Sequence, residues 1–139
     1  MDKNVDKDLI TFGFKGEKEI PESLLLKYGY RYKKNQIIIK ENEKTYDIYL
    51  IVNGSCYVTR KEDKKYKILN YLDKGDIFGE MALFSKTERA ATIIAKDDNT
   101  VVLKFSEKDF IEIFKLHPRW VDKIIHQMSD RIIKMIKKL

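Results

Sequence analysis

Between residues 30 and 105 the chain is a succession of short segments rich in β-branched and aromatic residues, and this pattern constrains the fold more than any other feature. The segments recur about every ten residues and are separated by polar breaks such as ENEK, KEDKK and KDDN. Short strands at this spacing are typical of an antiparallel sandwich, barrel or roll. We predict a mainly β fold with strands at YRYKKNQIIIK, YDIYLIV, SCYVTR, YKILNYL, AATIIA and TVVLKF.

Two turns in this region are predicted from residues that tolerate a positive φ. Asn53 and Gly54 follow one another between two predicted strands, which is a strong signal for a tight turn. Asn42 lies in the ENEK break, and asparagine tolerates the left-handed conformation that such a turn requires. Both turns favour the antiparallel arrangement.

A short helix is expected before the first strand. Pro21 is suited to a first helical turn, so residues 20–28 are predicted to form a helix that ends at Gly29. Residues 1–19 mix charged residues, glycine and isolated apolar residues, and we interpret them as a loose or partly helical entry segment. We therefore assign residues 1–28 to an N-terminal extension and short helix.

Helical patterns return after the last strand. Ser106 with Asp109 three residues later resembles a capping box and predicts a helix over Glu107–Leu116. Pro118 ends that helix and can begin a second one over residues 119–139. The expected organisation is one domain: the N-terminal extension, a β-roll over residues 29–106, and two C-terminal helices over residues 107–139 that act as a lid or a dimer contact.

The apolar residues of segment 119–139 recur at spacings of three and four residues. Such a seam is typical of paired helices, and it predicts a homodimer through this segment. Ile124, Ile133 and Ile136 widen the stripe enough for it to pack on its own β-roll instead, so both interpretations stay open. The seam consists of Val121, Ile125, Met128, Ile132, Met135 and Leu139.

Charge and cysteine content bound the class of protein. The 28 Lys and Arg residues outnumber the 22 Asp and Glu residues and give a net charge of +6, but the excess is spread along the chain. A solvated lysine-rich surface accounts for this better than a DNA-binding face. Cys56 is the single cysteine, which excludes an internal disulfide, and its apolar flanks predict a buried side chain. The N-terminus resembles no signal peptide, and no uncharged stretch reaches 18 residues, so we predict a cytoplasmic protein without membrane insertion.

The segment GDIFGEMALFSKTERAAT, residues 75–92, carries the candidate chemistry. Gly79 opens a run that can form one helical turn, whose free backbone N–H groups suit a phosphate. Arg89 follows nine residues after Glu80, and its planar guanidinium matches two oxygens of a phosphodiester. Glu80 is an acceptor for a hydroxyl group. A carboxylate, backbone amides and an arginine in one loop predict a sugar-phosphate site.

This segment, with its GDIFGEMAL and RAAT sequences, closely resembles the phosphate-binding cassette of cyclic-nucleotide-binding domains. Such domains occur in the bacterial catabolite activator protein, whose sensor domain the chain resembles, and in the regulatory subunits of protein kinase A. The resemblance covers about residues 28–136 and implies an antiparallel β-roll, a double-stranded, jelly-roll-like β-helix with a short cassette helix. It also implies a sensor that is not an enzyme and that uses no metal or cofactor.

The resemblance implies roles for individual residues. Glu80 is expected to accept a hydrogen bond from the ribose 2′-hydroxyl group, and Arg89 to pair with an exocyclic phosphate oxygen. Backbone amides near the two charged residues complete the expected anion site, and Met81, Leu83 and Phe84 are expected to fill the core or to couple the loop to the helices. The predicted ligand-binding residues are Gly79, Glu80, Met81, Ala82, Arg89, Ala90 and Ala91.

The identity of the base follows less directly from the resemblance. A hydroxyl residue after the arginine often contacts guanine in this family, and Ala90 offers none, so cAMP is favoured over cGMP. The base is expected to be covered by apolar residues of the last helix. The candidate cap residues are Ile132, Ile133, Met135 and Ile136.

Three other functions fit the sequence less well. A metal enzyme on a β-roll needs clustered ligands, whereas His117 and His126 lie nine residues apart in the helical tail. A transcription regulator of the catabolite activator type would place a DNA-binding domain after the last helix, so the chain could be the sensor half of such a regulator, with no direct DNA binding of its own and an unidentified output domain or protein. A non-binding dimerisation module is disfavoured by the intact pair of Glu80 and Arg89.

Overall fold

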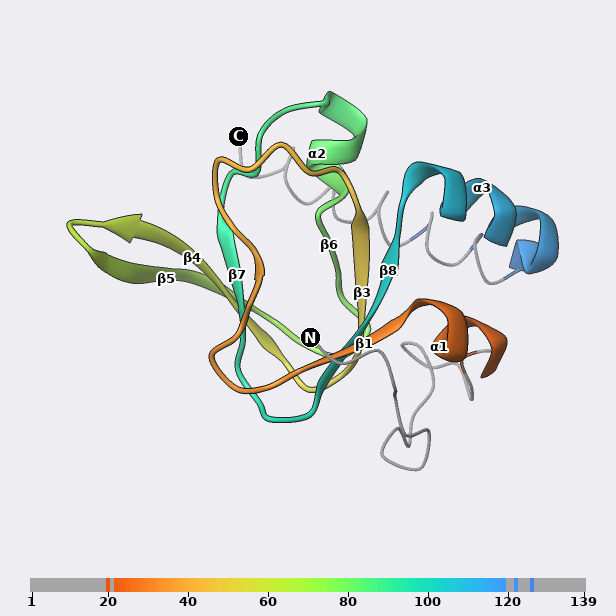
Figure 1. Cartoon of the computed structure of the whole chain (residues 1–139), viewed down its shortest axis with the longest axis horizontal. Coiled ribbons are helices and arrows are strands. Elements are labelled where there is room, and N and C mark those ends of the chain that lie inside the picture. Colours follow the sequence, from red (N-terminus) through yellow and green to blue (C-terminus); the bar gives the residue numbers. More distant parts are fainter. Residues whose placement is uncertain (1–19, 21, 120–121, 123–125, 127–139) are drawn as a thin grey trace.

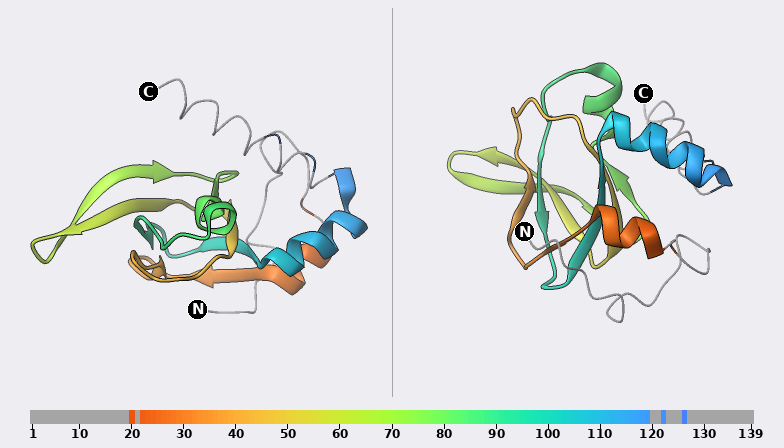
Figure 2. Two further views of the ribbon diagram at one scale, coloured as in Figure 1. Left: turned by 90° about the horizontal axis from the view of Figure 1, so that it is seen from above. Right: turned by 45° about the vertical axis from the view of Figure 1, so that its right-hand side comes forward.

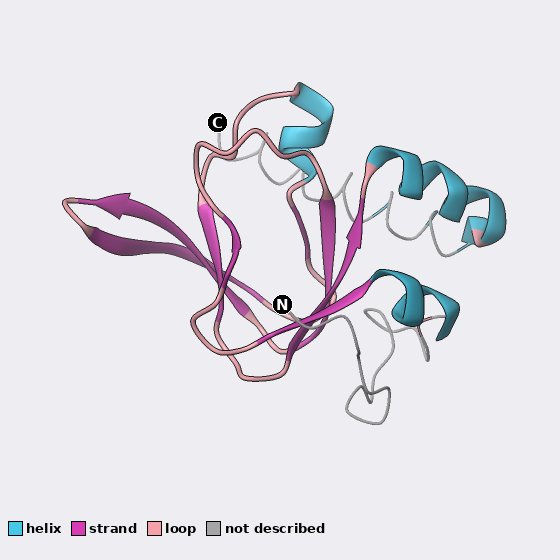
Figure 3. Ribbon diagram, in the orientation of Figure 1, coloured by secondary structure: helices cyan, strands magenta, loops and turns pink. Residues whose placement is uncertain are grey.

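The computed structural model describes residues 20, 22–119, 122 and 126. Within this range the chain forms two four-stranded antiparallel sheets and three helices (Figures 1 and 3). The elements in chain order are α1 (Glu22–Tyr28), β1 (Gly29–Tyr32), β2 (Ile37–Ile39), β3 (Ile48–Asn53), β4 (Cys56–Glu62), β5 (Lys65–Leu72), β6 (Ile77–Phe78), α2 (Glu80–Ser85), β7 (Thr92–Ala95), β8 (Thr100–Phe105) and α3 (Glu107–Leu116).

Apart from the β4–β5 hairpin, which lies wholly in the second sheet, consecutive strands belong to different sheets. The first sheet has the order β1-β8-β3-β6, and the second has the order β2-β7-β4-β5. Every pair is antiparallel, and most neighbours within a sheet are far apart in sequence. The chain therefore winds into a roll with the two sheets facing each other (Figure 1). The prediction of an antiparallel β-roll with flanking helices is confirmed.

Strand β3 separates two hydrophobic clusters. Ile48, Leu50 and Val52 point to the outer face of the first sheet, which is covered by α1 and α3. Tyr49 and Ile51 point to the interior between the sheets. Because side chains alternate along a strand, a strand covered on both faces is apolar at every position. This explains the continuous apolar run YLIV within β3.

The segment YRYKKNQIIIK does not form the single strand that we predicted. It contains β1 and β2, which belong to different sheets, with a turn at residues 33–36 between them. Asn35 has a φ of 72° and donates its N–H to the carbonyl oxygen of Ala95 at 2.8 Å. The backbone N–H of Lys33 is held by the Gln36 side chain at 2.6 Å. These contacts turn the chain without glycine or proline, the usual turn signals.

The β4–β5 hairpin extends as an arm from the body of the roll (Figures 1 and 2). Its two turn residues, Asp63 and Lys64, have φ angles of 49° and 71°. Two consecutive positive φ angles define the type I′ turn that suits the twist of a two-residue hairpin. The arm exposes seven of the eight residues of β5, and only Leu72 at its base is buried.

The helices begin close to where the sequence predicts. Helix α3 coincides with the predicted range and begins with the predicted capping box. In this box, Ser106 Oγ accepts a hydrogen bond from the N–H of Asp109 at 3.1 Å, and Asp109 Oδ2 accepts one from the N–H of Ser106 at 3.0 Å. Pro118 and Arg119 are helical after it. Helix α1 spans Glu22–Tyr28, within the predicted range, and its Tyr28 ring meets the Phe105 ring edge-on at 5.2 Å.

Further local predictions are confirmed. Cys56 is fully buried, and Asn42 has a φ of 70° in the turn before β3. In the part of the chain described, no helix has the length and apolarity needed to cross a membrane. The seam residues between Val121 and Leu139 lie outside the described residues.

Candidate functional site

The candidate site begins at Gly79, where β6 ends and α2 starts. Gly79 has a φ of 86° and a ψ of −4°. A Cβ atom on this residue would lie 2.7 Å from the carbonyl oxygen of Asp47 and 2.9 Å from Nη1 of Arg89, closer than real Cβ contacts. The position therefore requires glycine for its backbone conformation and for space. No side chain caps the start of α2, which leaves N–H groups of its first turn for another acceptor.

Arg89 lies in the loop between α2 and β7 and is buried, with 4% of its surface exposed. Its guanidinium makes three hydrogen bonds of 2.9 Å: Nε donates to Thr45 Oγ1, Nη1 to the carbonyl oxygen of Gly79, and Nη2 to the carbonyl oxygen of Asp47. A buried charge needs such partners. These three acceptors are neutral, and no carboxylate among the described residues forms a salt bridge with Arg89, so its positive charge is fixed in place without being neutralised by direct contact.

Burial and the neighbouring acidic groups have opposite effects on the pKa of Arg89. Burial lowers the pKa of its guanidinium, while the nearby acidic groups of Tyr49, Asp47, Glu43 and Glu80 raise that pKa. A guanidinium stays protonated in proteins at neutral pH even when it is partly desolvated. Arg89 is therefore a cation buried away from bulk water, where its attraction for an anion is stronger than in water.

The backbone around Arg89 is tied to a turn before β3. The N–H of Arg89 donates to the carbonyl oxygen of Glu43 at 2.9 Å, and the carbonyl oxygen of Arg89 accepts from the N–H of Asn42 at 2.8 Å. The left-handed conformation of Asn42 is what brings this turn alongside the cassette. Arg89 is thus held by its backbone and its side chain to the same stretch of chain.

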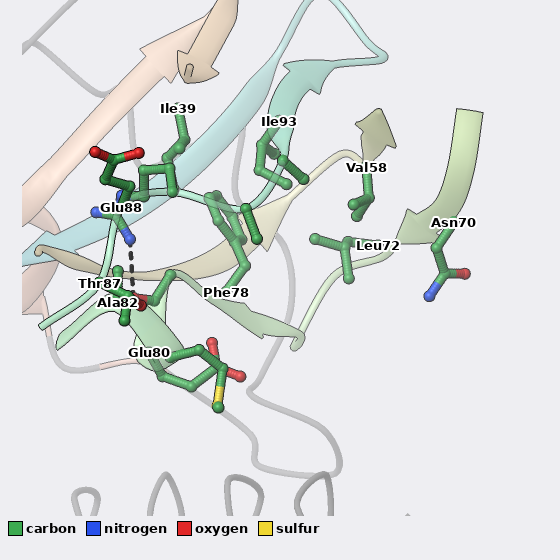
Figure 4. A pocket seen from close by; sticks show the side chains of 15 residues that line it. Ile39, Val58, Asn70, Leu72, Phe78, Glu80, Ala82, Thr87, Glu88 and Ile93 are labelled. Atoms are coloured by element: carbon green, nitrogen blue, oxygen red, sulfur yellow. Dashed lines mark hydrogen bonds between the residues drawn. The ribbon is translucent and has the colours of Figure 1, made fainter. Parts of the chain in front are cut away.

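A pocket of about 460 Å³ lies between the cassette and the interior of the roll. All seven predicted ligand-binding residues line it, from Gly79–Ala82 on one side and Arg89–Ala91 on the other. Figure 4 shows this pocket with Glu80 and Ala82 at the cassette helix and Phe78 and Ile93 beneath the opening. The other lining residues are Ile39, Val58, Asn70, Leu72, Phe78, Thr87, Glu88 and Ile93.

The pocket combines a polar end with an apolar wall. The cassette supplies a carboxylate, a guanidinium and backbone amides, whereas the wall is made by aliphatic and aromatic side chains of the roll. Glu80 is 4% exposed, so its carboxylate lies at the lining and not in bulk solvent. An elongated molecule with an anionic end and a flat apolar part matches this distribution of groups.

The side chains of α2 divide between the core and the surface. Leu83 is buried and belongs to the outer hydrophobic cluster, as predicted. Met81 and Phe84 are 45% and 58% exposed, so these two residues do not fill the core, and the alternative role of coupling the loop to the helices stays a prediction for them. The helix is too short to bury more than one face. Met81 lines the pocket opening instead.

Several supporting residues were not found from the sequence. Thr45 and the carbonyl oxygen of Asp47 hold Arg89, and neither has a motif that marks it, because every residue carries a carbonyl group. Tyr49 lies behind Gly79, and its ring stacks on Phe78 with centroids 4.9 Å apart. Asn70 also lines the pocket. Its position in the otherwise apolar strand sequence ILNYL was a signal that could have singled it out.

The remaining predicted residues lie elsewhere or outside the described part. Ile132, Ile133, Met135 and Ile136, the predicted base cap, are outside the described residues. His117 Nε2 lies 3.4 Å from Ser23 Oγ, and neither His117 nor His126 lines the pocket. Over residues 20, 22–119, 122 and 126, no three His, Cys, Asp or Glu side chains form a cluster suited to a metal ion.

Comparison with known protein families identifies the family to which this chain belongs. The family described as "Cyclic nucleotide-binding domain" matches residues 30–117, which is more than half of the chain and includes both sheets and the cassette. The chain belongs to this family. As a cyclic nucleotide-binding domain, it has Glu80 and Arg89 within the matched segment.

Individual relatives place this cyclic nucleotide-binding domain among regulatory proteins. It is 33% identical over 105 residues to the cAMP-activated global transcriptional regulator CRP of Salmonella typhimurium, which covers 74% of the chain and 50% of the relative. It is 29% identical over 99 residues to the cAMP-dependent protein kinase regulatory subunit of Mycosarcoma maydis, covering 68% of the chain and 18% of the relative. The chain thus spans about half the length of the first of these relatives, and less of the second.

A solved structure supports the fold of the domain. The crystal structure of the Thermus thermophilus catabolite activator protein superposes with a TM-score of 0.66 at 23% identity, covering 86% of this chain and 56% of the other. At this identity the likeness concerns the fold alone. It agrees with the β-roll described above.

Proposed function

We propose that this domain binds a 3′,5′-cyclic nucleotide in the pocket under the cassette, with cAMP favoured over cGMP, and acts as a sensor and not as a catalyst. The observation that carries the proposal is the pocket that brings together the buried charges of Glu80 and Arg89 with the uncapped start of α2. Membership of the cyclic nucleotide-binding domain family supports it.

Each part of the pocket has a role in this proposal. Arg89 pairs with a phosphate oxygen, since its guanidinium is oriented by three neutral acceptors and keeps its charge. Glu80 accepts from the ribose 2′-hydroxyl group. The amides of Gly79, Ala82, Ala90 and Ala91 complete the anion site, which is consistent with the lack of a Cβ atom at Gly79.

The preference for cAMP rests on two observations. Ala90 follows the arginine and has no hydroxyl group to offer to guanine. The relatives named above are called cAMP-activated and cAMP-dependent, respectively. On this proposal, Ile132, Ile133, Met135 and Ile136 cover the base from the last helix.

Signalling is proposed to proceed through the C-terminal helices. A ligand shifts an equilibrium only if it binds one conformation better than another. Bound nucleotide would favour one position of α2, and the exposed ion pair between Lys86 at the end of α2 and Glu107 at the start of α3, at 3.1 Å, links the two helices. The segment 119–139 would then change its packing on the roll or on a second copy, and an output domain or protein would read that change.

The test is calorimetric titration of cAMP and cGMP into the wild type, Glu80→Ala and Arg89→Ala. We expect tighter binding of cAMP than of cGMP, and a loss of affinity of about 30-fold to several-thousand-fold in each variant, because deleting a buried charged partner costs about 2–5 kcal/mol. Arg89→Lys, which keeps the charge but not the planar fork, should restore only part of the affinity.

Matched controls remove charges outside the pocket. Glu62 and Lys67 lie on the exposed hairpin. The variants Glu62→Ala and Lys67→Ala should therefore bind cAMP with the affinity of the wild type. Circular dichroism of each variant checks that it is folded. Equal affinities in the wild type, Glu80→Ala and Arg89→Ala would disprove the assigned roles.

A further inference from the structure

The outer face of the second sheet carries exposed apolar side chains that the ligand pocket does not use. Helices α1 and α3 cover the outer face of the first sheet. Among the residues that the structure describes, no helix packs on the corresponding face of the second sheet (Figure 1). Four large side chains of the second sheet are between 42% and 54% exposed, namely Ile37, Tyr66, Ile68 and Tyr71.

The strand pairing places these side chains on one face. Val58 on β4 lines the ligand pocket, so Tyr57 and Thr59 on either side of it point to the opposite, outer face. Tyr57 pairs directly with Ile94, and Ile94 with Ile37, so the outer face continues to β2. Residues paired directly across a ladder share a face. On the β4–β5 arm the outer face therefore contains three pairs: Tyr57 with Tyr71, Thr59 with Ile68, and Lys61 with Tyr66.

The hydroxyl groups on this face already have partners within the protein. Thr59 Oγ1 donates to the carbonyl oxygen of Thr92 at 2.9 Å, and Thr92 Oγ1 accepts from the N–H of Glu41 at 3.0 Å. Both threonines are buried. Covering the face with an apolar surface therefore strips no water from these two hydroxyl groups, and the desolvation cost stays low.

Lysine side chains lie over the tyrosine rings of the same face. The Nζ atom of Lys61 is 5.9 Å from the centroid of the Tyr66 ring. The Nζ atom of Lys96 is 5.9 Å from the Tyr57 ring and 5.5 Å from the Tyr71 ring, and these two rings meet edge-on at 5.5 Å. The ammonium groups are thus held beside the apolar surface and not apart from it.

The β4–β5 arm concentrates positive charge. From residue 56 to residue 72 it has five Lys and Arg residues against Glu62 and Asp63, so it carries half of the chain's net charge of +6. Every charged residue of the arm is exposed. Glu62 follows Lys61 on β4 and therefore points to the other face, and Asp63 lies in the turn. On the arm, the outer face presents cations without carboxylates.

This combination of groups is complementary to an anionic lipid surface. Tyrosine and aliphatic side chains enter the boundary between lipid headgroups and acyl chains, while lysines beside them reach the lipid phosphates. A second copy of the same face would bring the lysines of two arms together, which is unfavourable. A nucleic acid would use the positive charge but would leave the aliphatic side chain of Ile68 without a role.

We infer that the outer face of the second sheet, together with the β4–β5 arm, is a peripheral binding surface for membranes that contain anionic phospholipids. Such contact needs no segment that spans the bilayer. The surface lies on the opposite side of the second sheet from the ligand pocket, so the inference does not rest on the proposed function.

The test is co-sedimentation with vesicles of phosphatidylcholine alone and of equal parts phosphatidylcholine and phosphatidylglycerol. The wild type should bind the anionic vesicles only, and less tightly as the salt concentration rises. Lys61→Gln and Lys96→Gln should each weaken binding about fivefold. Ile68→Thr and Tyr71→Thr remove apolar area without changing charge, and each should weaken binding about 3- to 10-fold.

Matched controls make the same kinds of change on the helices. Lys108→Gln removes an exposed cation from α3, and Leu26→Ser removes an exposed apolar side chain from α1. Both variants should bind the anionic vesicles with the affinity of the wild type. Circular dichroism checks that every variant is folded.

Four results would overturn the inference. The first is a wild type that does not bind anionic vesicles. The second is wild-type affinity in both Ile68→Thr and Tyr71→Thr, which would show that charge alone holds the protein on the vesicles. The third is binding of a DNA duplex that is tighter than vesicle binding and is lost in the two lysine variants. The fourth is a lower molecular mass of Ile68→Thr in analytical ultracentrifugation without lipid, which would show that a second copy covers this face.

Discussion

At the scale of single residues, the site depends on close contacts among Gly79, Arg89 and Asp47. The carbonyl oxygens of Gly79 and Asp47 both accept from the Arg89 guanidinium, and the Asp47 oxygen and Arg89 Nη1 leave no space for a Cβ atom at position 79. Two of the three contributions come from the backbone. The position of the arginine is thus determined by two backbone carbonyl groups together with the hydroxyl group of Thr45.

Gly79→Ala should therefore damage both stability and binding. The left-handed conformation alone costs a residue with a Cβ atom about 1–2 kcal/mol, and the displaced Arg89 adds the loss of its hydrogen bonds. We expect unfolding in urea at a lower midpoint and weaker binding of cAMP. Gly54→Ala, at a φ of 78° but remote from the pocket, is the control. It should lower stability and leave the cAMP affinity of the folded protein unchanged. A cAMP affinity of Gly79→Ala equal to that of the wild type would show that the position of Arg89 does not depend on glycine at position 79.

At the scale of elements, the cassette helix α2 and helix α3 each follow directly after a strand of the first sheet. Helix α3 starts immediately after β8, which pairs with β3, and β3 pairs with β6, the strand that leads into Gly79 and α2. The exposed ion pair between Lys86 and Glu107 joins the two helices directly but contributes only about 0–1 kcal/mol. A movement of α3 therefore meets a small electrostatic barrier from this contact.

Loss of the capping box should loosen α3 without affecting the roll. Ser106→Ala removes the acceptor for the N–H of Asp109, which costs about 1 kcal/mol of helix stability. We expect hydrogen exchange to become faster for amides of α3 and to stay unchanged for β3 and β8. Lys108→Ala, in the same first turn but outside the cap, is the control. Unchanged exchange in α3 of the Ser106 variant would show that packing of Ile113, not the cap, holds the helix.

At the scale of the whole molecule, the interior of the roll holds titratable groups that stay neutral. Burial raises the pKa of Cys56 from 9.0 to about 12, with Asp97 adding to the shift. Burial also raises the pKa of Tyr32 from 10.0 to about 12, with Tyr30 and Cys56 adding to it. Both groups belong to the interior cluster. The fold is therefore linked to their protonated forms.

Stability should fall under alkaline conditions for this reason. Below the pKa that Cys56 has in the unfolded chain, the thiol is protonated in both the folded and the unfolded state, and its contribution to the free energy of unfolding is fully present. Between pH 9.0 and about 12 the unfolded chain releases the Cys56 proton that the folded chain retains, so stability declines. We expect Cys56 to account for a loss on the order of 1–2 kcal/mol by about pH 10.5.

Urea unfolding of the wild type and Cys56→Ala at several pH values measures this contribution. The variant starts from a lower stability near neutral pH, because it loses packing, but it should decline less steeply above pH 9.0. Val52→Ala, a change in the buried β3, is the control for packing alone and should keep the steeper decline. Identical slopes in all three proteins would contradict the assignment to Cys56.

The sequence by itself determined the elements whose causes are local. Strand β8 and helix α3 agree with their predicted bounds, because a short run of β-branched and aromatic residues and a capping box are both properties of neighbouring residues. The cassette is likewise one contiguous segment, and its seven predicted residues line one pocket.

The tertiary structure alone decided the features that depend on contacts between distant backbone groups. The turn at Asn35, which divides the predicted first strand, is held by the carbonyl oxygen of Ala95. The acceptors of Arg89 include the carbonyl oxygen of Asp47, which is 42 residues away in the sequence. Every residue carries the same backbone donor and acceptor, so no residue type reveals which of these groups will meet until the chain has folded.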